Sequence, residues 1–151
     1  MSFFDIGKVC LFSSMSGTIT FNGQPVANAR LVRTCDRDGP KVDETVTNEN
    51  GYFKFPAMFE RTITKFLPQE FVASQKIIVY YGSGKHEIWS AIKRSREENS
   101  EARDNPLIVR CELNSERNSI IVGGSPIHSL CVRDVEPDPK IDWEKEGFFD
   151  K

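Results

Sequence analysis

Four residues have the types that hydrolases use for acyl transfer. Ser83, His86 and Glu87 lie in one short segment, and a serine, a histidine and a carboxylate make up a hydrolase triad. A nucleophile elbow, however, needs a strand before the serine and a helix after it. The residues on both sides of Gly82-Ser83-Gly84 have a strand pattern, so the sequence predicts a hairpin turn here. His128 lies in an apolar segment without an acidic neighbour, which favours a structural histidine over a general base.

The cysteines and glycines indicate no metal or nucleotide site, and we expect no cofactor. Cys10, Cys35, Cys111 and Cys131 are widely spaced, with no C-x-x-C pair and no histidine at ligand spacing. Four buried thiols are the main expectation, and a disulfide between Cys111 and Cys131 in an oxidising compartment is the alternative. The glycine-rich segments lack the lysine and Ser/Thr of a phosphate-binding loop.

One candidate partner surface surrounds Trp89. This tryptophan precedes a charged segment that contains Lys93, Arg94 and Arg96, and tryptophan and arginine are enriched at interface hot spots. The alternative is a buried tryptophan beneath a solvated loop. The segment 93–105 is dense in charge, which predicts either such a loop or a short surface helix.

A second candidate surface is the C-terminal tail, residues 134–151. It has seven acidic residues against three lysines but also carries Ile141 and three aromatic residues, Trp143, Phe148 and Phe149. Large apolar groups in a solvated tail must dock on this domain, on a second copy or on another protein. The three aromatic residues are therefore further candidates for binding a partner.

Short strands with turns between them must position all these residues. Asn22-Gly23 is suited to a two-residue hairpin turn, because such a turn needs positive φ at both positions. Asn48 to Gly51 supplies another turn, and Phe53 and Phe55 after it share one face and are core candidates. Further strands are expected in these segments: 9–12, 17–21, 30–34, 44–47, 76–81, 86–92, 107–113, 119–122 and 127–132. In the strand over 86–92, alternation places Ile88 and Ile92 on one face and Trp89 on the other.

The first third of the chain resembles a known family. The order of Gly17-x-Ile19, Asn22-Gly23-x-Pro25-Val26, Ala29-x-Leu31 and Thr47-x-x-Asn50-Gly51-x-Phe53 is similar to that of the carboxypeptidase regulatory-like domain. That resemblance implies an antiparallel β-sandwich of the transthyretin-like or immunoglobulin-like kind. We expect about seven to nine strands and an irregular C-terminal tail, because eight or nine short strands favour a sandwich over an α/β fold.

Composition is consistent with one soluble domain and an appended tail. The chain has 151 residues, of which 38% are hydrophobic and 28% charged, and we expect a β-sandwich over 1–133 followed by the tail over 134–151. A net charge of −2 makes nucleic acid an improbable partner. No signal sequence or membrane span is visible near the N-terminus, so we expect a cytoplasmic protein. We expect a monomer or a homodimer.

Three hypotheses about function follow. The first is a non-enzymatic protein-binding module, because small sandwich proteins of this outline resemble bacterial proteins associated with type VI secretion. Some of those are thought to be immunity proteins that neutralise a toxin. The second is an accessory or carbohydrate-binding module, which an exposed Trp89 would favour. The third is a small hydrolase, but the chain lacks the C-terminal Tyr-Arg-Gly-Ser and the N-terminal histidine of transthyretin-like hydrolases.

Overall fold

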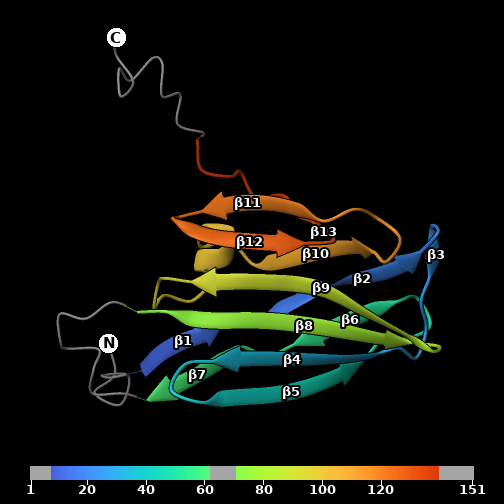
Figure 1. The fold of residues 1–151 in the computed structure, drawn as a ribbon, viewed down its shortest axis with the longest axis horizontal. Coiled ribbons are helices and arrows are strands. Elements are labelled where there is room, and N and C mark those ends of the chain that lie inside the picture. Colours follow the sequence, from blue (N-terminus) through green and yellow to red (C-terminus); the bar gives the residue numbers. More distant parts are fainter. Residues whose placement is uncertain (1–7, 62–70, 140–151) are drawn as a thin grey trace, which may run out of the picture.

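The protein is an all-β sandwich in the computed structural model, which describes residues 8–61 and 71–139. Its larger sheet has six strands in the order β11-β12-β9-β8-β4-β5 and crosses the whole view of Figure 1. The bounds of these strands are β4 (Arg30–Asp36), β5 (Pro40–Val46), β8 (Ala73–Tyr81), β9 (Gly84–Lys93), β11 (Asn118–Val122) and β12 (Ser125–Ser129).

A five-stranded sheet packs against the larger one. It has the order β13-β10-β2-β3, and β6 also pairs with β2. Its strands are β2 (Met15–Phe21), β3 (Gln24–Pro25), β6 (Tyr52–Phe55), β10 (Leu107–Glu112) and β13 (Cys131–Val132). A separate pair, β1 (Lys8–Phe12) and β7 (Met58–Arg61), lies at the lower left of Figure 1, and one 3₁₀ helix, η3 (Ser100–Ala102), precedes β10.

The core forms where the alternating residues of both sheets meet. Phe53 and Phe55 are buried on β6, which confirms the prediction for them, and Leu31 and Ile77 are buried on the facing sheet. Because side chains alternate along a strand, the residues between these positions face outward. This alternation gives the larger sheet a solvent-facing side, which we name the outer face of the six-stranded sheet.

The predicted tight turns are confirmed. Asn22 and Gly23 have φ values of 52° and 81° and connect the paired residues Phe21 and Gln24. The Glu112 carboxylate accepts hydrogen bonds from the backbone N–H groups of Gly23, Asn114 and Asn22 and from the Thr20 hydroxyl. These donors, of which Gly23 has the largest effect, lower the pKa of Glu112 to about 2. A single carboxylate from β10 therefore fixes the β2–β3 turn.

Three expectations about the strands need correction. The sheets are not wholly antiparallel, because β2 and β10 run parallel, with Met15 opposite Leu107. The described residues hold thirteen strands rather than seven to nine, since β3, β7 and a split of the segment 127–132 add short pieces. The strand expected to start at residue 44 already begins at Pro40, because a tight turn at Gly39, with φ 117°, lets β5 pair with β4 along its whole length.

A disulfide joins the edge strand β13 to β10. Cys111 and Cys131 are directly opposite each other in the antiparallel β10–β13 pair, and their sulfurs are bonded. The structure therefore confirms the alternative expectation, a disulfide between Cys111 and Cys131, and the main expectation of four free thiols is wrong. Cys10 and Cys35 are buried free thiols as expected, and burial raises the pKa of Cys35 to about 12.

Candidate protein-binding face

A row of polar residues crosses the outer face of the six-stranded sheet. Strand register places Thr34 opposite Lys76, Lys76 opposite Ser90, Ser90 opposite His128, and His128 opposite Ser119. Directly paired residues in neighbouring strands have side chains on the same face. Five strands from three separate parts of the chain thus present hydroxyl, ammonium and imidazole groups side by side.

This face is hollowed over its strands β4, β8 and β9, at the end where β8 begins. A hollow of about 420 Å³ is lined by residues of β4, β8 and β9, namely Thr34, Asp36, Ser74, Gln75, Lys76, Ser90, Ala91 and Ile92. Short serine and threonine side chains form much of its lining, and the longer Lys76 and Ile92 also border it. Its volume lies in the range of ligand pockets, about 300–1,000 Å³, so the hollow has room for a side chain or a small group of a partner.

Exposed apolar residues lie on the same face. Val42 and Val46 on β5 are 58% and 55% exposed, and Ile121 on β11 is 50% exposed. The solvent side of an antiparallel sheet normally carries polar residues, because only one side packs on the core. These apolar groups on the edge strands β5 and β11 form, together with the hollow between them, the mixed surface that protein interfaces have.

Charged pairs order the side chains at one end of this face. Arg30 donates to Glu44 at 2.7 Å and lies 4.4 Å from the centre of the Tyr80 ring. Glu87 accepts from Arg117 at 3.0 Å and lies 3.9 Å from the Lys76 ammonium. Because these groups are largely exposed, each pair contributes little to stability, about 0–1 kcal/mol. These pairs present both positive and negative charges on the outer face of the six-stranded sheet, and such charges influence which partner binds.

The residues considered as a hydrolase triad, Ser83, His86 and Glu87, do not assemble into one. Gly82 and Ser83 form the tight turn between β8 and β9, as expected, and the Glu87 carboxylate is bonded to Arg117. The structure instead pairs His128 with Ser119, whose Oγ lies 2.5 Å from His128 Nδ1. Within residues 8–61 and 71–139, no carboxylate hydrogen-bonds to this histidine, so the group that orients a catalytic base has no counterpart there. The sequence alone could not reveal the pair, because only the β11–β12 register brings these residues together.

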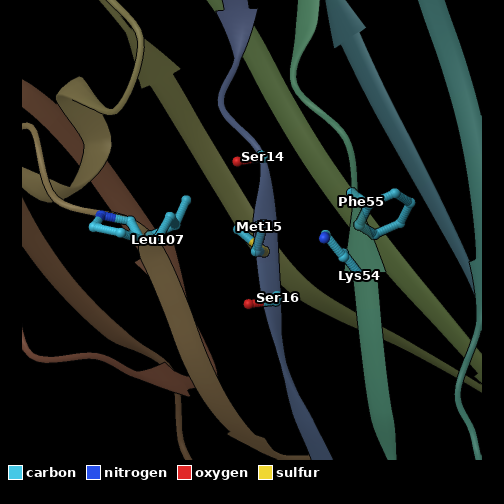
Figure 2. Close-up of a pocket in the computed structure, with 7 residues that line it drawn as sticks. Ser14, Met15, Ser16, Lys54, Phe55 and Leu107 are labelled. Carbon is cyan, nitrogen blue, oxygen red and sulfur yellow. The ribbon is translucent and has the colours of Figure 1, made fainter.

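A second, smaller pocket lies on the outer side of the five-stranded sheet. Figure 2 shows Ser14, Met15 and Ser16 along β2 and the segment before it, with Leu107 on one side and Lys54 on the other. Phe55 and Pro106 complete the lining, and the pocket has a volume of about 50 Å³. That volume holds a few water molecules but no substrate of ordinary size.

Trp89 is not the exposed partner-binding residue that the sequence allowed, because its side chain is fully buried. A register shift between Ile77 and Ile78 makes a β-bulge in β9, so that both Ile88 and Trp89 point inward. Ile92 lies on the outer face, and the expectation that it shares a face with Ile88 is wrong for the same reason. Trp89 donates from Nε1 to the Gln75 Oε1 at 3.0 Å, which satisfies its polar atom inside the core.

Lys93 is also buried, at 1% exposure, and therefore is not available to a partner. Its ammonium donates to the Ser95 and Glu97 carbonyls and to the Ser100 hydroxyl, and lies 3.8 Å from the Glu101 carboxylate. The segment 93–105 is thus not a simple solvated loop, because its buried Glu101 pairs with Lys93 at the end of β9 and accepts hydrogen bonds from Ser13 and Gln75 elsewhere in the sandwich. Arg94 remains exposed just beyond β9, and Arg96 is half-buried.

The other predicted partner-binding residues, Trp143, Phe148 and Phe149, lie outside the described residues. The beginning of the tail, however, is docked on the domain. The Asp138 carboxylate accepts from the backbone N–H groups of Gly123 and Gly124 and from Arg103, and its own N–H donates to the Ile121 carbonyl. The two glycine N–H groups lower the pKa of Asp138. The tail is therefore tied to the β11–β12 turn.

The fold and this face define a β-sandwich with a mixed polar and apolar sheet surface. The chain belongs to the family named Domain of unknown function (DUF6795), whose model matches residues 15–116. The match includes β2 to β10 and all the residues that line the hollow, whereas β11, β12 and Cys131 lie beyond it. No curated protein and no solved structure matches the chain. In the described residues, no helix has the length and hydrophobicity needed to cross a membrane.

Proposed function

We propose that this protein is a non-enzymatic protein-binding module that holds its partner on the outer face of the six-stranded sheet. The observation that carries the proposal is the exposure of Val42, Val46 and Ile121 on β5 and β11, the two edge strands of the sheet, on either side of the hollow. A face of this kind gains free energy when a partner covers its apolar groups and fills the hollow. The charged pairs Arg30–Glu44 and Glu87–Arg117 on the same face supply specificity for the partner.

The resemblance to proteins associated with type VI secretion gives the proposal its specific form. In that form the protein is an immunity protein and its partner is a toxin that it neutralises. The carbohydrate-binding alternative relied on an exposed Trp89 as a stacking group, and the burial of this residue removes that support. The cytoplasm remains the predicted compartment, although disulfides are typical of oxidising compartments. The oxidation state of Cys111 and Cys131 in the cell tests that prediction.

Substitutions on the two sheet faces test the proposed surface. The double variant Val42→Glu/Val46→Glu places charge on the proposed face, and Ile108→Glu/Val132→Glu does the same on the five-stranded sheet. The second pair is a matched control, because its side chains are 57% and 58% exposed. Tagged full-length protein first captures its partner from the native host, and the affinity of each variant for that partner is then measured. We expect a loss of about tenfold or more for the first variant only, as for hot-spot residues.

Two outcomes would contradict the proposal. Equal affinity of the two variants would place the partner elsewhere, and loss of affinity only in the Ile108→Glu/Val132→Glu variant would move the interface to the five-stranded sheet. For the immunity form, co-expression must relieve the toxicity of the captured partner. A partner that is not toxic, or whose toxicity persists, would refute that form while leaving the binding surface intact.

A further inference from the structure

Two arginines, Arg33 and Arg133, are buried against aromatic rings. Arg33 shows which hydrogen-bond partners a buried guanidinium group requires. Arg33 is fully buried, and its guanidinium carbon lies 4.8 Å and 4.6 Å from the ring centres of Phe12 and Phe55. Its Nε and Nη2 donate to the two carboxylate oxygens of Asp43, at 2.9 Å and 2.5 Å, and Nη1 donates to the Ser13 carbonyl. The Nε–Nη2 edge thus holds a carboxylate in the bidentate geometry that makes arginine–carboxylate pairs strong.

Arg133 has the same setting without the carboxylate. It is 9% exposed, and its guanidinium carbon lies 5.1 Å from the centre of the Trp89 ring. Nη1 donates to the Ser129 hydroxyl at 3.1 Å and to the Cys131 carbonyl at 3.3 Å. Nε and Nη2 are buried and have no hydrogen-bond partner. The free edge of Arg133 is therefore the edge with which Arg33 holds Asp43.

An unpaired buried guanidinium edge is costly. Burial lowers the pKa of Arg133 to about 10, so the group is still charged at neutral pH. A buried charge normally has a counter-charge, and buried donors normally have acceptors. Asp134, the next residue along the chain, has a side chain that is 92% exposed and lies 3.7 Å from Arg110, and the buried Glu101 is bound by Ser13, Gln75 and Lys93, so neither supplies the missing carboxylate.

We propose that Arg133 is a carboxylate-binding subsite that accepts an incoming carboxylate on its Nε–Nη2 edge. The Ser129 hydroxyl, the Cys131 carbonyl and the Trp89 ring hold the guanidinium in place, and the disulfide of Cys131 fixes the short strand before it. Because both free nitrogens are covered from solvent, binding requires a local movement of the surrounding chain. The proposal is independent of the binding face on the six-stranded sheet.

The carboxylate has two possible sources, which one experiment separates. One source is this chain, whose sequence beyond Pro139 contains Asp142, Glu144, Glu146 and Asp150. The other is a carboxylate outside the chain, for which acetate is the probe. The readout is the Nε–H resonance of Arg133 in ¹⁵N-labelled full-length protein, assigned by its absence in Arg133→Lys. A variant with all four tail acids changed to their amides is compared with the wild type, and both are titrated with sodium acetate against sodium chloride at equal ionic strength.

The outcomes assign the source or overturn the proposal. A shift of the Arg133 resonance between the wild type and the amide variant assigns the carboxylate to the tail. A saturable shift with acetate but not with chloride assigns it to an external group. In either case Arg94→Lys, which alters an exposed arginine, must leave the shift unchanged. A resonance that is the same in both proteins and insensitive to acetate would overturn the proposal. This readout uses folded protein that retains Arg133, so it does not depend on whether Arg133→Lys is stable.

Discussion

A substitution of Lys93 tests whether this residue belongs to a partner-binding surface or stabilises the fold. Its ammonium has three hydrogen-bond acceptors and lies 3.8 Å from Glu101, and both residues are almost fully buried. Replacing Lys93 with methionine keeps most of the length of the side chain, which becomes one atom shorter, but removes the charge and all three hydrogen bonds. The Glu101 carboxylate is then left buried without its cation, although Ser13 and Gln75 still donate to it.

The expected loss of stability is large. Removing one partner of a buried ion pair costs about 3–5 kcal/mol, because the remaining charge stays desolvated. A domain of ordinary stability has only about 5–15 kcal/mol to lose. For a chain of this size each kcal/mol shifts the melting temperature by about 2–4 °C, so Lys93→Met should melt about 6–20 °C below the wild type. Urea unfolding followed by circular dichroism measures the free energy of unfolding directly.

Two further variants make this prediction specific. Arg94→Met changes the exposed neighbour and should alter the free energy of unfolding by no more than about 0.5 kcal/mol. Adding Glu101→Gln to Lys93→Met removes the orphaned charge, so the double variant should regain part of the lost stability. If Lys93→Met proves as stable as Arg94→Met, Lys93 is solvated and the buried-pair argument is wrong. If the double variant is no more stable than the single one, the cost does not come from the unpaired carboxylate.

The remaining predictions concern the Glu112 carboxylate that holds the β2–β3 turn, the disulfide, and the parallel pair of β2 and β10. Because the folded-state pKa of Glu112 is lowered to about 2, its contribution is fully present above about pH 4.5 and disappears as the pH falls towards 2. Wild type should therefore have a larger free energy of unfolding than Glu112→Gln at pH 6, and the two values, measured by urea titration, should converge near pH 2. A difference that does not change with pH would contradict the role of the Glu112 carboxylate in holding the β2–β3 turn. Cys111 and Cys131 are separated by 20 positions, so the variant with both changed to serine should lose about 3 kcal/mol, measured under oxidising conditions. Full stability of that variant, or four free thiols rather than two by mass spectrometry of the unfolded wild type, would rule out the bond. Gly17→Ala should strongly destabilise the fold, because its Cβ would lie 2.0 Å from the Val109 carbonyl oxygen; a fold unaffected by this change would mean that β2 and β10 do not approach so closely.

The sequence of a single strand does not specify the binding face. Alternation in residues 30–34 correctly indicates a half-buried strand, with Val32 and Thr34 on one side. It does not reveal that Thr34, Lys76, Ser90 and His128 form one row, because the row depends on three strand registers. Cross-strand register is set by long-range packing, which a single segment does not encode. The face was therefore missed, although several of its residues lie in correctly predicted strands.

Short stretches of the sequence specify the local features of this protein. Asn22-Gly23 sets its hairpin turn, because few other pairs accept positive φ at both positions, and the alternating Phe53 and Phe55 set a buried strand. Only the tertiary structure decided which way Trp89 points, because a bulge that forms through pairing with β8 turns it into the core. The same holds for the pairing of Cys111 with Cys131, which depends on an edge strand docking beside β10. Turn and strand preferences act over a few residues, whereas burial and pairing depend on the whole sandwich.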